Sequence, residues 1–491
     1  MLLFDSLSAK KKNVPKSARR PLRLFVCGPT VYDMPHLGHA RTYLVFDALV
    51  KFLRADGYRV HYLQNITDID DKIILRAARA HLPPQKIAAR YLKAYLDAMQ
   101  ALGIDAVDEY ARATDYIPHI VRQVTTLIKR GAAYRIEGEG YYFDITTFPS
   151  YGKLSRRTVA QAEDAESRID AGVHKRNKGD FCLWKFASPA HLALLQKKRG
   201  GERRPVVVGA TPYWRTSLGW GRPGWHIEDT AITEAHFGPQ YELHGGGVDL
   251  KFPHHEAEIA QQETVSGRTP FVQIWLHTGV LTIRGKKMSK SLKNFVTIQE
   301  FLQRFHPQAL RLFVLSSHYR SPIDYSPAHI TAHEKNLLSL MEIRAKLDRQ
   351  AASSHSPPAK ITTLLQNLRK EFLNALRDDF ATPLALAALW KLTGEVNKKL
   401  WLLSPAEARA ARNTITSLCS MLGIAIPQFT IPPKIRSKAN KREKYRTNKQ
   451  FILADKLRKE IEQLGYEIED TPRGQILLPR SVPHYGNKKR T

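Results

Sequence analysis

Hydrophobic residues in the first third of the chain alternate between short apolar runs and longer segments with helical spacing. Arg23–Cys27 is a short apolar run followed by Gly28-Pro29, which is typical of a buried strand that ends in a turn. From Ala40 to Leu53 apolar residues recur at helical spacing, and Tyr58–Ile66 then alternates as a strand does. This order predicts the start of a parallel α/β sheet.

The middle of the chain departs from this alternation. An irregular insertion is expected there, with strand-like stretches at Gly140–Phe148 and Asp180–Lys185 and a basic loop at Lys197–Arg204. The α/β pattern resumes near Gly224 and continues to about Tyr325. The two α/β stretches therefore predict one sheet that is split by an insertion.

The last third of the chain changes to a helical period. This period runs from about Ala328 to Gly423 and is interrupted by the Ser/Pro-rich stretch Ser353–Pro358, which predicts a helical bundle. Residues 434–449 hold eight Lys or Arg against the single acid Glu443, which predicts a flexible basic connector. One helix and two strand-like runs are expected from Phe451 to Pro479.

These patterns divide the chain into five regions. We expect the first half of an α/β domain at 1–110, a connective insertion at 111–222, and the second half of that domain at 223–327. A helical bundle at 328–431 and a basic linker with a small C-terminal unit at 432–491 complete the chain. The predicted fold class is α/β, followed by an α-helical bundle and a small C-terminal α/β unit.

The charge of the chain favours a polyanionic partner. Lys and Arg outnumber Asp and Glu by 76 to 46, which gives a formal net charge of +30. Cations that neutralise phosphates release bound counterions, so such an excess promotes binding to nucleic acid. The alternative is a solvated basic surface that has no partner.

The spacing of the cysteines and the hydropathy of the chain indicate whether disulfides, a zinc knuckle or a membrane span are expected. Cys27, Cys182 and Cys419 lie far apart in the sequence, so neither a disulfide framework nor a CxxC zinc knuckle is indicated. A reducing cytoplasm fits this usage. No stretch approaches the roughly 18 apolar residues of a membrane span. We therefore expect a cytoplasmic protein without membrane contact. We also expect a monomer.

The first chemical motif is the segment His36-Leu37-Gly38-His39, between the first predicted strand and the first predicted helix. A glycine at a helix N-terminus lets the backbone approach a phosphate, and two imidazoles add hydrogen-bond donors. The motif is short enough to occur by chance, and its position after a strand is what favours a phosphate site. A GxGxxG dinucleotide fingerprint is absent.

The second motif is Lys287-Met288-Ser289-Lys290-Ser291, preceded by Gly285. Two lysines on a short loop can neutralise the charge that develops on a pyrophosphate leaving group. The alternative is a solvated loop, which a five-residue match makes a poor explanation. HxGH followed some 250 residues later by KMSKS resembles the signature pair of class I aminoacyl-tRNA synthetases, which implies a Rossmann-like parallel sheet.

The surrounding segments resemble the cysteinyl-tRNA synthetase family over nearly the whole chain. Only the segment from about Ala187 to Trp214 looks like extra sequence. The segments that carry the resemblance are Cys27–Asp33, Asn65–Lys72, Gly221–Glu228, His244–Asp249, Phe252–Glu256, His318–Pro322, Asp378–Pro383 and Ala454–Arg458.

A metal site is a further candidate. His254 and Glu258 are four apart in a helical pattern and so point to a common centre, although a polar helix face has the same spacing. The family resemblance implies that both ligate zinc together with Cys27 and a second cysteine. Asp229 stands at the position of that second cysteine. Because aspartate also ligates zinc, the expected ligands are Cys27, Asp229, His254 and Glu258.

The resemblance also implies a substrate pocket and a reaction. Zinc would bind the thiolate of L-cysteine, Thr67, Trp225 and His244 would line the pocket, and Asp249 would lie near the adenylate. From the residues alone, Trp225 is as well explained as core and Thr67 as a helix N-cap. The implied activity attaches cysteine to tRNA(Cys) through cysteinyl-adenylate, with Mg²⁺-ATP as co-substrate.

Two other functions stay open from the sequence. A cysteine:amino-sugar ligase of the mycothiol type makes the same adenylate, but such relatives lack the full tRNA-binding tail. A degenerate synthetase paralogue that only binds RNA is the second alternative, and the departure at Asp229 is the feature that keeps it open.

Overall fold

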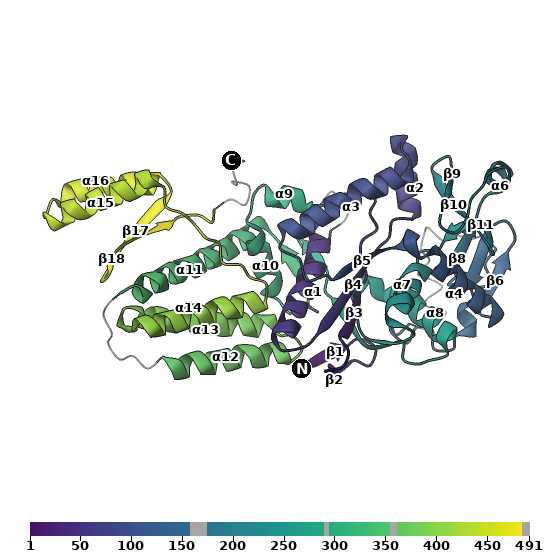
Figure 1. Ribbon diagram of the computed structural model, residues 1–491, viewed down its shortest axis with the longest axis horizontal. Helices are drawn as coiled ribbons and strands as arrows, with labels where there is room; N and C mark the ends of the chain where they lie inside the picture. The colour runs from purple at the N-terminus through teal and green to yellow at the C-terminus, as the bar shows by residue number, and fades with distance from the viewer. Residues whose placement is uncertain (158–173, 289–293, 354–360, 484–491) are drawn as a thin grey trace. The chain divides into compact units, whose positions relative to one another are not determined.

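A parallel sheet of five strands lies at the centre of residues 2–280 (Figure 1). The computed structural model describes residues 1–157, 174–288, 294–353 and 361–483. The strands are β3 (Leu22–Val26), β4 (Val60–Ile66), β5 (Glu109–Arg112), β12 (Tyr241–Gly247) and β13 (Val272–Thr278). Their spatial order is β13-β12-β3-β4-β5, and each pairing is parallel.

The two halves of this sheet come from two distant stretches of sequence. β3 pairs with β12, with Leu24 opposite Leu243, so the stretches on either side of the insertion meet at the middle of the sheet. The strand order reverses at this point, and in open parallel sheets ligands bind outside the carboxyl ends of the strands there. The prediction of a parallel sheet split by an insertion is confirmed.

Helices pack against the sheet or against one another, and some of them place residues at this edge. The helices are α1 (Leu37–Ala55), α2 (Asp71–Ala80), α3 (Pro84–Ala101), α4 (Ile117–Lys129), α7 (Ile227–Phe237) and α8 (Glu256–Ser266). Helix α1 ends shortly after the apolar run from Ala40 to Leu53, with Asp56 as its C-cap, and Gly57 follows with a φ of 84°. A hairpin of β1 (Leu2–Asp5) and β2 (Lys10–Asn13) reaches the sheet through Asp5 Oδ1, which accepts from the Trp275 amide at 2.9 Å.

The strand-like stretches predicted at Gly140–Phe148 and Asp180–Lys185 are present as strands, but the prediction that the insertion is irregular is wrong. The segment contains a six-stranded antiparallel sheet in the order β6-β7-β8-β11-β10-β9. Its strands are β6 (Ala133–Ile136), β7 (Gly140–Phe143), β8 (Phe181–Phe186), β9 (Val206–Val208), β10 (Thr211–Thr216) and β11 (Gly219–Pro223). These strands are only three to six residues long and include Gly and Pro, so no sustained alternation marks them. The buried rings of Trp184 and Trp214 anchor the sheet instead.

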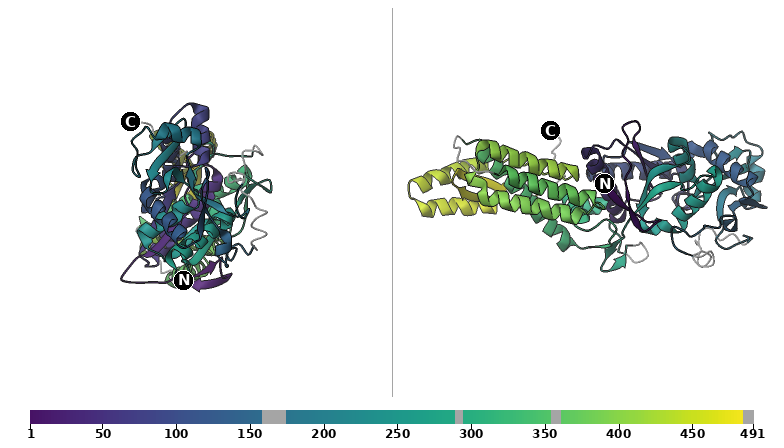
Figure 2. Two further views of the ribbon diagram at one scale, coloured as in Figure 1. Left: turned by 90° about the vertical axis from the view of Figure 1, so that its right-hand side faces the viewer. Right: turned by 90° about the horizontal axis from the view of Figure 1, so that it is seen from below.

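Residues 281–491 form the second compact unit. It opens with a three-stranded sheet of β14 (Leu281–Ile283), β15 (Lys286–Lys287) and β16 (Ile323–Tyr325), with α9 (Ile298–Leu302) and α10 (Pro307–Leu315). Four long helices then lie side by side (Figure 2), which confirms the predicted bundle: α11 (Pro327–Ala351), α12 (Thr362–Arg377), α13 (Thr382–Lys399) and α14 (Pro405–Met421). Among the described residues, no helix combines the length and apolarity that crossing a membrane requires.

The prediction of a flexible connector at residues 434–449 is also wrong. These residues fall in α15 (Pro433–Thr447) and the turn after it, and α15 packs against α16 (Phe451–Gln463) and a hairpin of β17 (Tyr466–Thr471) and β18 (Gly474–Pro479). Ile435, Ala439 and Arg442 are buried on one face of α15 at helical spacing. Arg442 donates two hydrogen bonds of 2.7 Å to the Asp470 carboxylate. The sequence does not reveal this buried face of the helix, because one of its three residues is a cation.

Candidate active site

The HxGH segment caps the N-terminus of α1. His36 is the N-cap residue, and its Nδ1 accepts a hydrogen bond from the Gly38 amide at 3.1 Å. His39 Nδ1 in turn accepts from the His36 amide at 3.3 Å, and the two rings stack with centroids 3.8 Å apart. A helix begins here because each imidazole satisfies an amide that the first turn leaves without a helical partner.

Burial keeps both imidazoles neutral. It lowers the pKa of His36 to about 4, against an opposing effect of the nearby Asp249 carboxylate. Burial also lowers the pKa of His39 well below its ordinary value. Because each Nδ1 accepts a backbone N–H, the proton of each neutral ring resides on Nε2. The two histidines therefore offer Nε2–H donors next to the positive end of a helix dipole, which suits an anion.

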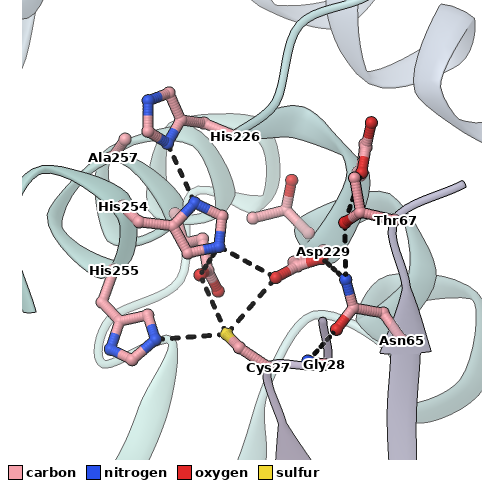
Figure 3. Close-up of polar contacts among 12 residues, drawn as sticks. Cys27, Gly28, Asn65, Thr67, His226, Asp229, His254, His255 and Ala257 are labelled. Carbon is pink, nitrogen blue, oxygen red and sulfur yellow. Dashed lines mark hydrogen bonds and ion pairs between the residues drawn. The ribbon is translucent and has the colours of Figure 1, made fainter. Parts of the chain in front are cut away.

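The four residues expected to hold zinc come together at the carboxyl edge of the sheet (Figure 3). Cys27 follows β3, Asp229 lies in the first turn of α7, His254 lies in a short turn before α8, and Glu258 lies in the first turn of α8. Cys27 Sγ lies 3.3 Å from Asp229 Oδ2 and 3.8 Å from Glu258 Oε1. His254 Nε2 lies 3.0 Å from Asp229 Oδ2 and 3.2 Å from Glu258 Oε1.

This arrangement fits a cation. One ligand atom from each of the four residues lies within 4.8 Å of the others, and all four side chains are buried. Within the described part of the chain, the side-chain partners of Cys27, Asp229 and Glu258 are histidine, asparagine or one another, and none is Lys or Arg. Glu258 Oε2 has no hydrogen-bond partner there. A buried carboxylate oxygen without a partner is costly unless a cation meets it.

The electrostatics point the same way. Burial, with the neighbouring Asp229 as a second cause, raises the pKa of Glu258 well above its ordinary value. Burial also raises the pKa of the Cys27 thiol, and the Glu258 and Asp229 carboxylates raise it further. These acids repel one another in a dry site, and a divalent cation would remove that repulsion. The cluster can therefore hold a metal ion.

Two further histidines border the cluster. His255 Nε2 lies 3.1 Å and His244 Nε2 lies 3.4 Å from Cys27 Sγ, so Cys27, His244, His255 and Glu258 form a second possible ligand group. Tyr241 Oη contacts His244 Nδ1 at 2.7 Å, and His277 Nε2 contacts His255 Nδ1 at 2.9 Å. His255, Tyr241 and His277 were not predicted from the sequence, although His255 directly follows His254.

A polar pair at the end of β4, Asn65 and Thr67, lies on the other side of Asp229. Asn65 Nδ2 donates to Asp229 Oδ1 at 2.6 Å, and Asn65 Oδ1 accepts from the Gly28 amide at 2.5 Å. Thr67 Oγ1 donates to Glu228 Oε2 at 3.0 Å. Thr67 is thus buried beside the cluster and does not cap a helix. Asn65 and Glu228 are site residues that sequence reasoning missed, although both stand in segments that carry the family resemblance.

Trp225 and Asp249 lie around the cluster at more exposed positions. The Trp225 ring stacks on His254 with centroids 4.4 Å apart, and 37% of the residue is exposed, so it is not a core residue. Asp249 lies in the turn after β12 and acts on His36 through its charge. Tyr43 joins the two parts of the site, because its ring stacks on His39 and its hydroxyl donates to the Cys27 carbonyl at 3.2 Å.

The KMSKS segment begins in the second compact unit. Lys287 is in β15, where its backbone pairs with Thr282, and Met288 is buried with its Sδ accepting from the Val296 amide. The turn before it is fixed by Gly285, whose amide donates to Asp324 Oδ1 at 2.9 Å and whose φ is 72°. Ser289, Lys290 and Ser291 lie outside the described residues.

Comparisons with known proteins decide the family. Residues 13–335 match the tRNA synthetases class I (C) catalytic domain, and residues 371–426 match the DALR domain. The chain is 38% identical to the cysteine–tRNA ligase of Thermococcus gammatolerans, covering 96% of this chain and 98% of that protein. It is 40% identical to the cysteine–tRNA ligase of Thermoplasma acidophilum, again covering 96% and 98%. The chain belongs to the cysteine–tRNA ligase family.

Solved structures share the fold of this cysteine–tRNA ligase family member. The LeuRS of an Agrobacterium radiobacter ternary complex has a TM-score of 0.60 at 12% identity, covering 83% of this chain and 84% of that one. The methionyl-tRNA synthetase of Mycobacterium tuberculosis, in complex with methionyl-adenylate, has a TM-score of 0.56 at 19% identity, covering 82% and 89%. The predicted class I synthetase fold is confirmed.

Proposed function

We propose that this chain is a cysteine–tRNA ligase that activates L-cysteine with ATP and transfers it to tRNA(Cys). The observation that carries the proposal is the buried group of Cys27, Asp229, His254 and Glu258 at the sheet edge beside the capped start of α1. A sulfur-seeking metal site next to a phosphate-binding helix terminus brings the thiol of cysteine and the phosphates of ATP together.

In the first step, a carboxylate oxygen of cysteine attacks the α-phosphorus of Mg²⁺-ATP. The bond from that phosphorus to the β-phosphate oxygen breaks, and pyrophosphate leaves with the electron pair. His36 and His39 donate from Nε2 to phosphate oxygens, and Gly38 leaves room for the backbone to approach. Burial lowers the pKa of both rings, so both are neutral. They therefore act as hydrogen-bond donors and need not gain or lose a proton during the reaction.

Lys287 and Lys290 would hold the leaving pyrophosphate, and Met288, Ser289 and Ser291 would shape their loop. The buried Met288 supports this role, since it ties the loop to the Val296 amide. The tRNA's terminal ribose hydroxyl then attacks the cysteinyl carbonyl, AMP leaves, and the hydroxyl proton is released.

We propose zinc as the resident metal, held by Cys27, Asp229, His254 and Glu258. When bound, zinc supplies a ligand position for the substrate thiolate, which favours sulfur over the hydroxyl of serine. Trp225 and His244 would border the side chain of the substrate. The Thr67 hydroxyl donates to Glu228, so we assign Thr67 to shaping the pocket wall, and Asp249 to the adenylate side near His36.

The second compact unit would bind tRNA. A hollow of about 750 Å³ on α15 is lined by Pro433, Arg436, Ser437, Asn440, Lys441, Lys444, Tyr445 and Asn448. Exposed cations with an aromatic ring suit an RNA backbone and its bases. The amino-sugar ligase is disfavoured, because it has no use for this surface or for a DALR domain at residues 371–426.

Two consequences of this function stay predictions. Because the proposed reaction uses ATP and tRNA, we expect the enzyme in the cytoplasm. We also expect it to act as a monomer, because one chain carries both signature motifs and the RNA-binding surface.

The experiment that tests the function is cysteine-dependent ATP–pyrophosphate exchange, followed by charging of tRNA(Cys) with cysteine and with serine in parallel. The proposal expects exchange with cysteine, cysteinyl-tRNA as product and no stable seryl-tRNA. Exchange without tRNA charging would favour the amino-sugar ligase. Absence of both, with tRNA binding retained, would favour the degenerate paralogue.

A further inference from the structure

The connective insertion carries a basic loop that the proposed reaction does not use. The loop is defined as residues 197–204 and holds five cations, Lys197, Lys198, Arg199, Arg203 and Arg204, against the single acid Glu202. It follows α6 (Pro189–Leu195) and precedes β9, at the outer end of the six-stranded sheet (Figure 1). All five cations are exposed.

The loop is built into the fold. Leu195, Val208 and Tyr213 form a small buried cluster with Ala187, and the Trp220 ring packs against it. Gly200 lies so close to the Trp220 ring that an added Cβ would stand 2.5 Å from it. Gly201 and Arg204 exchange two backbone hydrogen bonds of 3.3 Å, which close a tight turn around Glu202 and Arg203. The backbone that carries the cations is therefore held in a defined arrangement.

The cations of the loop have no acidic partners. Within the described part of the chain, none of the five side chains forms a hydrogen bond or an ion pair, whereas other exposed cations of the insertion do, such as Arg135 with Glu137 at 2.9 Å. The five cations outnumber the single acid Glu202 and repel one another, so an external polyanion lowers the free energy of the surface. A single phosphate would leave most of the positive charge of the loop without a counter-charge.

The shape fits a chain of phosphates. The loop borders a hollow of about 570 Å³ lined by Arg199, Gly200, Gly201, Glu202, Arg203 and Arg204 together with Pro118 of α4. Gly200 and Gly201 are among its lining residues and have no side chains, which leaves room for a sugar-phosphate backbone to come close.

We propose that the loop 197–204 binds the phosphate backbone of the tRNA being charged, as an RNA contact separate from the α15 surface. This inference rests on the proposed function. The 3′ end of the tRNA must reach the Cys27 cluster, which lies in the same compact unit as the loop, so the stem next to that end is the polyanion brought to this unit. Recognition is by charge and backbone shape rather than by base.

The test compares two triple variants of the full-length enzyme that remove equal charge. The loop variant is Arg199→Gln/Arg203→Gln/Arg204→Gln, and the control is Lys129→Gln/Arg130→Gln/Lys178→Gln, which removes three exposed cations elsewhere on the insertion. We expect the loop variant to raise KM for tRNA(Cys) about tenfold and to reduce the slope of log affinity against log salt by about two to three. Cysteine-dependent pyrophosphate exchange without tRNA should be unchanged in both variants.

A gain of binding provides a second measurement that misfolding cannot imitate. Glu202→Lys should strengthen tRNA(Cys) binding several-fold and steepen its salt dependence. An unrelated stem-loop RNA of equal length serves as the competing probe. Normal tRNA charging in the loop variant, or a loss of binding seen only with the unrelated RNA, overturns the inference. If the loop instead binds an acidic protein, tRNA charging by the loop variant should be normal. Failure of the proposed function is distinguishable, because it would abolish pyrophosphate exchange in the unmodified enzyme.

Discussion

Asn65 holds one oxygen of Asp229 and leaves the other free for the cluster. The Asn65 Nδ2 atom donates to Asp229 Oδ1 at 2.6 Å, while Asp229 Oδ2 faces Cys27 Sγ and His254 Nε2. The carboxylate therefore presents a single oxygen in a fixed direction, as the sulfur of a cysteine would. This orientation explains how an aspartate can stand at the position where the family resemblance expects a thiolate.

We expect Asp229→Ala to lose metal and serine discrimination together, and Asp229→Cys to keep or tighten metal binding. A carboxylate is a harder ligand than a thiolate, so restoring sulfur should favour zinc. The measurement is metal content per chain after purification without chelator, with cysteine and serine activation measured on the same samples. Asn65→Ala tests the positioning of Asp229, and losing the hydrogen bond that orients this carboxylate should weaken metal affinity by about 10–100-fold. Well under one zinc per chain in the unmodified protein, with no response to added zinc, would contradict the metal assignment.

Lys290→Ala should lower the rate of adenylation strongly and leave cysteine affinity nearly unchanged. The lysine meets charge that is present mainly in the transition state, so its loss should cost about 3–4 kcal/mol, or a hundredfold or more in kcat. Pyrophosphate exchange measures the effect. Lys286→Ala provides the control, since Lys286 is an exposed lysine of the same hairpin outside the motif. Near-normal exchange in Lys290→Ala would refute the role.

The protein should lose stability as pH falls from about 6.5 toward 4. Burial lowers the pKa of His36 from 6.5 to about 4, so between these values the unfolded chain binds a proton that the folded chain does not. The contribution of His36 is fully present above pH 6.5 and is lost through the folded pKa, on the order of 3 kcal/mol in total. Denaturant midpoints at several pH values measure the loss. His36→Asn keeps an N-cap acceptor and should flatten the profile; an unchanged profile would exclude His36 as a source.

Arg442→Met should loosen the C-terminal unit without affecting cysteine activation. The guanidinium is fully buried and makes two charged hydrogen bonds to Asp470, so its removal should cost about 2 kcal/mol. Amide hydrogen exchange in β17 and β18 reports the change. Arg446→Met is the matched control, because Arg446 is 40% exposed and lies 3.3 Å from the same carboxylate. Equal exchange rates in the two variants would show that burial of Arg442 does not matter.

Deleting residues from Pro432 onward should leave adenylation intact and weaken tRNA charging. It should also flatten the salt dependence of tRNA binding. The change in salt dependence should be smaller than the loss of eight phosphate contacts would give, because Arg442 is buried and Lys438 is paired with Glu460. The comparison is made at about 0.15 M salt, where screening is physiological. Normal binding and charging by the truncated enzyme would mean that this surface has no RNA-binding role.

The parts that could be predicted from the sequence are those encoded by neighbouring residues. The strand before Gly28, the helix from Ala40 and the bundle after Ala328 follow from local periodicity, and the structure has each of them. The resemblance placed Cys27, Asp229, His254 and Glu258 in one group, and the structure brings these four together.

The remaining features depend on contacts that periodicity does not encode. Asn65 and Asp229 are 164 residues apart, so nothing local marks their hydrogen bond. Only two strands of the insertion sheet were predicted, because its short strands are held by Trp184 and Trp214 rather than by alternation. Helix α15 was missed because charge dominates its composition, and only the burial of Arg442 against Asp470 completes its packed face.

The pairing of β3 with β12 sets the order in which the site can appear during synthesis. Cys27 precedes Asp229 by 202 residues, and His254, Glu258 and the strand that joins the two half-sheets come later still. At ribosomal rates of about 5–20 residues per second, on the order of 10–40 seconds pass between the synthesis of Cys27 and that of Asp229, its first carboxylate neighbour. Throughout that interval the nascent chain displays an unprotected sulfur that is open to oxidation or to stray metal. The Cys27 thiol can therefore become buried in its site only after Asp229 and the residues that follow it have been synthesised.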